Sequence, residues 1–119
     1  MPRTYLLLVD MPRMLGEIVT DALEAEADFE VLGEVEGGAV REAVERQPVD
    51  VVVVGHDDDA LAAGLLDVRP RLKVLGVIDD GRDAALYELR PHRALVGELS
   101  PERLVAVIRE AGPPSASAR

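Results

Sequence analysis

Short, continuously apolar segments recur along the chain and alternate with longer segments of mixed polarity. Such segments are typical of strands covered on both faces of a sheet, and they occupy residues 5–9, 51–54 and 74–78. The four consecutive valines of 51–54 favour a central strand, because β-branched residues are poor helix formers. Residues 29–35 alternate apolar side chains with Glu30 and Glu34, which indicates an edge strand, and residues 94–96 predict a short fifth strand.

Between these strands, apolar residues follow a helical spacing. The pattern predicts helices over residues 15–23, 40–47, 61–68 and 101–111, with a weaker pattern over 84–89. Ser100 is a suitable N-cap for the last helix, and Pro101 suits its first position. Asp79-Asp80-Gly81 predicts a turn. Residues 112–119 have no apolar period, so we expect a flexible tail or linker there.

The order of these elements predicts one α/β domain over residues 1–111. Five βα units in succession form a parallel sheet with helices on both faces, which makes a three-layer sandwich. The flavodoxin-like strand order 2-1-3-4-5 is the most economical arrangement. Functional groups in such sheets lie at the carboxyl ends of the strands, which directs attention to Asp10, Gly55, Ile78 and Gly97.

Composition narrows the classes of function. The net charge of −10 argues against binding of nucleic acid or of an anionic membrane by this domain. The chain has no cysteine, so disulfides and thiolate chemistry are excluded. The apolar run at 5–9 ends at Asp10, too early for a signal peptide or a membrane span, and we expect a cytoplasmic protein. No catalytic motif or phosphate-binding loop is present, so we expect neither an enzyme nor a cofactor.

Several segments together resemble one family. They are Leu6-Leu7-Leu8-Val9-Asp10, Phe29 to Val35, Pro48-Val49-Asp50 before the four valines, and Leu99 to Leu104. They are similar to response-regulator receiver domains, most of all to those attached to helix-turn-helix transcription factors. The resemblance extends over about residues 5–111. It implies a phospho-switch in which two acids after the first strand bind Mg²⁺ and an Asp after the third strand accepts the phosphoryl group. A hydroxyl residue then ends the fourth strand and a Lys ends the fifth.

The residues at most of these positions lack the chemistry that the family uses. Asp10 keeps the first acid, whereas the other positions hold Met11 (second acid), Gly55 (acceptor), Ile78 (hydroxyl), Gly97 (Lys) and Ala94 (the aromatic that relays the signal). Mg²⁺ requires hard oxygen ligands, and phosphoryl transfer requires charge neutralisation, so we expect no metal site and no acceptance of phosphate. The sequence thus predicts a non-phosphorylatable pseudo-receiver of an atypical response regulator, a signalling and transcription-regulatory module that acts by protein interaction.

Two alternatives remain open at this point. The string His56-Asp57-Asp58-Asp59 could supply a displaced phosphoacceptor at Asp57 or Asp58, although it could equally form a solvated cap for the helix that follows. Its consecutive side chains diverge, which argues against a metal site. The second alternative is a small-ligand sensor that uses the emptied crevice between Met11, Ile78 and Gly97.

A partner surface is also suggested by the resemblance. Tyr87, Arg90 and Arg93 fall in the predicted fourth helix and the following loop, and Arg103 falls in the last helix. In receivers this region often contacts a protein partner or a second copy, which would give a homodimer. The basic residues are notable in an acidic chain, although all four could equally be ordinary surface residues.

Overall fold

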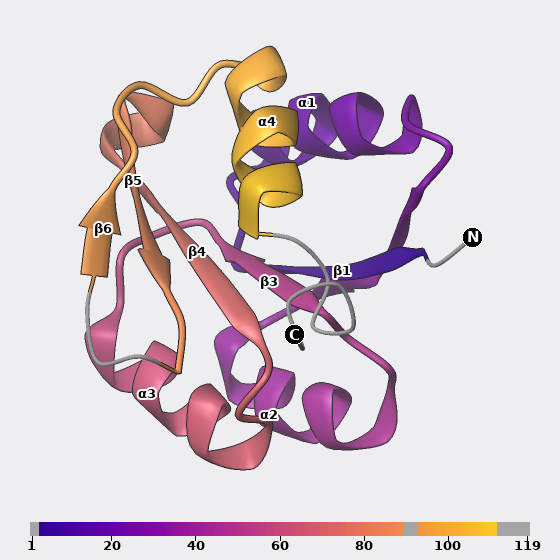
Figure 1. Ribbon diagram of the computed structural model, residues 1–119, viewed down its shortest axis with the longest axis vertical. Coiled ribbons are helices and arrows are strands. Elements are labelled where there is room, and N and C mark those ends of the chain that lie inside the picture. The colour runs from indigo at the N-terminus through magenta and orange to yellow at the C-terminus, as the bar shows by residue number, and fades with distance from the viewer. Residues whose placement is uncertain (1–2, 90–92, 112–119) are drawn as a thin grey trace.

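The computed structural model describes residues 3–89 and 93–111, and it contains strands and helices in alternation (Figure 1). The strands are β1 (Thr4–Val9), β2 (Phe29–Val35), β3 (Val51–Val54), β4 (Lys73–Ile78), β5 (Asp83–Tyr87) and β6 (Arg93–Leu95). The α-helices are α1 (Arg13–Glu24), α2 (Gly37–Arg46), α3 (Asp59–Val68) and α4 (Pro101–Ala111), and a 3₁₀ turn, η1, spans Asp79–Gly81. Among these described helices, none combines the length and apolar character that crossing a bilayer requires.

All strands join one six-stranded sheet in the order β2-β1-β3-β4-β5-β6. The first four strands in this order pair in parallel, so the predicted order 2-1-3-4 and the edge position of β2 are confirmed. β4 pairs with β5 and β5 with β6 in antiparallel fashion. The sheet is therefore parallel from β2 to β4 and antiparallel from β4 to β6.

Helices cover both faces of the sheet, so the three layers predicted from the sequence are confirmed. On one face, alternate residues of the central strands such as Leu6 and Val53 pack under α1 and α4. On the other face, their neighbours Leu7 and Val52 pack against α2 and α3. Figure 1 shows these two pairs of helices on opposite sides of the strands. The continuous apolar runs arise because every residue of β1 and β3 must meet one layer or the other.

The prediction of a helix over residues 84–89 is wrong, because residues 84–87 belong to strand β5. After β4, Asp79, Asp80 and Gly81 have φ angles of 51°, 54° and 99°, and this left-handed turn sends the chain back beside β4. Ile78 then pairs with Asp83 across the hairpin. Asp and Gly tolerate left-handed backbone better than most residues, which is why this tripeptide can reverse the chain so tightly.

The hairpin also moves the predicted fifth strand. The segment predicted at 94–96 forms β6, but β6 lies beyond β5 and has no place next to β4. The expected arrangement of five parallel strands with a helix before the last one is therefore incorrect in this part of the chain. Ala84 and Ala85 are fully buried on opposite faces of the sheet, so small side chains allow β5 to be covered on both sides.

Candidate functional site at the carboxyl ends of the strands

The loops after β1 and β3 are in direct backbone contact. The amide of Gly55 donates a hydrogen bond to the carbonyl oxygen of Val9 (2.8 Å). A Cβ atom on Gly55 would overlap the carbonyl oxygen of Asp10 and would lie 3.0 Å from the Cα atom of Met11. No L-amino acid side chain therefore fits at Gly55 without displacing the backbone after β1. The position that the resemblance assigns to the phosphoacceptor is closed by the main chain itself.

The carboxylate of Asp10 is held by two neighbouring segments. Its Oδ1 accepts a hydrogen bond from the amide of Gly37 at the start of α2 (3.0 Å), and its Oδ2 lies 3.4 Å from Nε2 of His56. A Cβ on Gly37 would lie 2.8 Å from Oδ2, so glycine permits this close approach. A negative charge is favourable at a helix N-terminus, because the helix dipole is positive there. Asp10 thus serves to fix α2 and the loop after β3.

The remaining positions of the expected crevice do not converge. Met11 is buried in the core under α1 and α4, whereas Ile78 packs against the core on the opposite face of the sheet. Gly97 follows β6, two strands away from β4, which corresponds to about 10 Å at the usual spacing of strands. Its amide donates to Oδ1 of Asp83 (3.1 Å). The structure does not bring Met11, Ile78 and Gly97 together around one cavity.

The side chains of the acidic string after β3 point to different partners. Oδ1 of Asp58 accepts from the amide of Leu61 (3.0 Å) and caps the N-terminus of α3, as expected for a capping loop. Asp57 and Asp59 both contact the hydroxyl group of Tyr87, the latter at 2.6 Å. Within residues 3–89 and 93–111, no group of three or more His, Cys, Asp or Glu side chains is arranged to hold a metal ion.

Tyr87 is the residue whose role sequence reasoning missed. Instead of lying in an exposed helix, it belongs to β5, and its side chain is only 9% exposed. Its hydroxyl group joins β5 to Asp57, which precedes α3, and to Asp59, the first residue of α3. Gly76 makes room for this contact, since a Cβ there would come within 3.2 Å of Asp57. Tyr87 therefore stabilises the fold and does not contribute to an exposed interface.

The other residues of the expected partner surface are placed differently. Arg90 lies outside the described residues, and the backbones of Arg93 and Ala94 belong to β6. The guanidinium group of Arg103 donates to the carbonyl oxygen of Val96 at 3.3 and 3.4 Å and lies 3.9 Å from the carboxylate of Glu110. Arg103 thus connects α4 to the segment after β6, and the backbone of Arg93 pairs with that of Tyr87 across β5 and β6.

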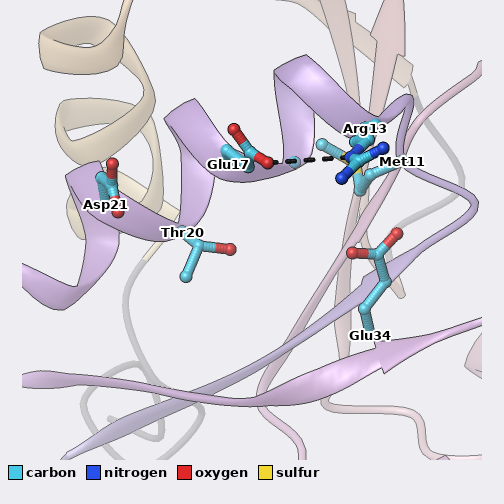
Figure 2. A pocket seen from close by; sticks show the side chains of 7 residues that line it. Met11, Arg13, Glu17, Thr20, Asp21 and Glu34 are labelled. Carbon is cyan, nitrogen blue, oxygen red and sulfur yellow. Dashed lines mark ion pairs between the residues drawn. The ribbon is translucent and has the colours of Figure 1, made fainter.

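A separate hollow of about 590 Å³ lies between α1 and β2 (Figure 2). Glu34 projects from β2 toward α1, and Thr20 projects from α1 toward β2. Glu17 and Asp21 line its outer rim, where Arg13 lies 4.0 Å from Glu17. The hollow is open and mostly acidic, and Met11, which follows β1, also lines it. Comparison of the chain with protein-family models, with curated protein sequences and with solved structures gave no match.

Proposed function

We propose that this chain is a non-phosphorylatable pseudo-receiver with a flavodoxin-like fold, which acts in the cytoplasm as a protein-interaction module of a signalling or transcription-regulatory system. The proposal rests on the receiver-like sequence pattern, on the parallel order of β2, β1, β3 and β4, and on the chemistry of the strand ends. The hairpin of β4 and β5 is a departure from the family's pattern.

The observation that carries the proposal is the contact between Gly55 and the backbone after β1. Phosphoryl transfer to a receiver needs a carboxylate at this position, in line with the donor and beside a divalent cation. Here the Cβ of any side chain would overlap the carbonyl oxygen of Asp10. The site therefore lacks both the nucleophile and the room for one.

The neighbouring carboxylates offer no replacement for the lost acceptor. Asp58 is engaged as the cap of α3, and Asp57 contacts the hydroxyl group of the buried Tyr87. An attacking Asp58 would have to leave the amide of Leu61, and loss of such an N-cap costs about 0.5–2 kcal/mol. At the position that the resemblance assigns to the Lys, Gly97 has no side chain, and it follows β6, two strands from β4.

The proposal is tested by incubating the purified chain with acetyl phosphate and Mg²⁺ and measuring its intact mass, with an active receiver domain treated in parallel. We expect the active domain to gain one phosphoryl group and this chain to gain none. A stoichiometric, acid-labile adduct on this chain would contradict the proposal. In that case the variants Asp57→Asn and Asp58→Asn would show whether either residue carries the adduct.

A further inference from the structure

Helix α1 exposes large apolar side chains on its outer side. Met14 is 76% exposed and Ile18 is 47% exposed, and their spacing of four residues places them on the same side of the helix. One turn further, Ala22 enters an open groove of about 320 Å³ between α1 and α4, which Pro101 and Val105 also line. We call these five residues the α1–α4 strip. The groove is also lined by Glu102 and by Glu26, which pairs with Arg109.

Acidic side chains border the strip on both sides. Glu17 and Asp21 follow it along α1, and Figure 2 shows both projecting from this helix. Glu102 borders it on α4 and is exposed. Arg13 lies 4.0 Å from Glu17 and offsets one of the two negative charges along α1, so this border keeps a reduced negative charge. The strip is therefore apolar along its centre and negative at its edges.

We propose that the α1–α4 strip binds an amphipathic helix of a partner protein that carries Lys or Arg on both sides of an apolar stripe. Helices recognised in this way place apolar residues at intervals of three and four along a groove, and charges at the rim select the partner. The inference rests on the proposed function, because it names the kind of partner that the interaction module would bind.

Charge complementarity selects this occupant over two others. In a second copy of the chain docked through the same strip, the acidic borders of the two copies would face each other, which is unfavourable. The net charge of −10 opposes this self-association further, and it also opposes docking on an anionic membrane. A basic amphipathic helix would match both the apolar centre and the acidic edges.

The test measures binding of labelled synthetic peptides to the full chain by fluorescence anisotropy. The first peptide, of about 18 residues so that it is long enough to form a helix, has Leu at intervals of three and four and Lys at the flanking positions. The second has Glu in place of Lys, and the third is a scrambled version of the first. We expect binding of the first peptide only.

Two pairs of matched variants locate the binding surface. Met14→Ser/Ile18→Ser should weaken binding of the Lys peptide by about tenfold or more, since truncating buried apolar contacts removes at least that much affinity. As the control, Leu89→Ser/Leu95→Ser removes two side chains outside the strip that are 63% and 61% exposed. This variant should leave binding of the Lys peptide unchanged. Circular dichroism confirms that each variant is folded.

The second pair tests the acidic border. Glu17→Lys/Asp21→Lys should weaken binding of the Lys peptide by a similar factor. The control, Glu42→Lys/Glu45→Lys, makes the same change in net charge at exposed positions of α2, and it should leave binding unchanged. Equal losses in the two charge variants, or equal binding of the Lys and Glu peptides, would overturn the proposal. So would a concentration-dependent dimer that Met14→Ser/Ile18→Ser disrupts, or association with anionic vesicles through the same residues.

The two proposals fail separately. A phosphoryl adduct together with specific peptide binding would overturn the pseudo-receiver assignment, but it would support the α1–α4 strip as a binding surface. Absence of an adduct together with absence of peptide binding would overturn only the proposal that the α1–α4 strip binds a helix.

Discussion

The absence of a side chain at Gly55 determines how the loop after β3 packs against Asp10. Because Gly55 has no Cβ, the loop after β3 can approach the carbonyl oxygen of Asp10 and form its hydrogen bond to Val9. The carboxylate of Asp10 accepts a hydrogen bond from the amide of Gly37 and thereby fixes the first turn of α2. Installing an acid at Gly55 would first have to open this contact.

We therefore expect Gly55→Ala to lower the free energy of unfolding by about 1–3 kcal/mol, because an added methyl group overpacks a closed contact. The control is Gly64→Ala in α3, where an added Cβ meets no atom within 4 Å. In that helix interior, alanine should raise the free energy of unfolding by about 0.5–1 kcal/mol. Urea denaturation measures both, and equal effects in the two variants would contradict the closed contact.

At the level of elements, the hairpin of β4 and β5 depends on its left-handed turn. An ion pair between Lys73 and Glu88 (2.7 Å) joins the two strands near the open end of the hairpin. The turn at the other end holds two consecutive non-glycine residues, Asp79 and Asp80, at positive φ. Such residues cost free energy that glycine would not.

We expect Asp80→Val to destabilise the protein by about 1–2 kcal/mol, because a β-branched residue is strained at a φ of 54°. Asp80→Gly should leave the free energy of unfolding unchanged or raise it. Arg82→Val serves as the control, since Arg82 follows the turn in right-handed backbone. Chemical denaturation distinguishes them, and similar losses for Asp80→Val and Asp80→Gly would show that backbone conformation is not the cause.

The same hairpin marks the limit of prediction from the sequence. β1, β3 and β4 were predictable because burial on both faces demands unbroken apolar runs, and α1 was predictable from its spacing. β5 was not predictable from its own residues, because Ala84 and Ala85 suit a helix as well as a strand that is buried on both faces. The signal that distinguishes the two is the turn before them, which reverses the chain. The contact of Tyr87 with Asp57 spans 30 residues of sequence and exists only once β5 lies beside β4. Local patterns do not encode such a contact.

At the scale of the whole molecule, Arg109 of α4 joins the last helix to the segment between α1 and β2. It pairs with Glu26 (2.6 Å) and Asp28 (3.1 Å), and its guanidinium group lies 5.4 Å from the ring centre of Phe29. The hydrogen bonds to Glu26 and Asp28 raise the pKa of Arg109, so the group stays charged throughout the accessible pH range. One side chain thereby links distant parts of the chain.

Arg109→Ala should lower the urea midpoint more than Arg46→Ala, which removes a single exposed pair with Glu42 within α2. The difference should shrink as salt is added, because exposed charges are screened. A larger effect of Arg46→Ala, or a difference that grows with salt, would contradict this role. The contact with Phe29 should leave a residual difference at high salt.

The position of α4 also has a consequence for the protein during its synthesis. Leu104, Val107 and Ile108 are the last residues of the core that covers β1 and β3 on one face. While the ribosome is still holding these residues, that face of the sheet is incompletely covered, and uncovered apolar surface favours aggregation. The nascent chain is thus vulnerable until α4 has joined this core, and a chain truncated ahead of Pro101 would keep that vulnerability for the rest of its lifetime.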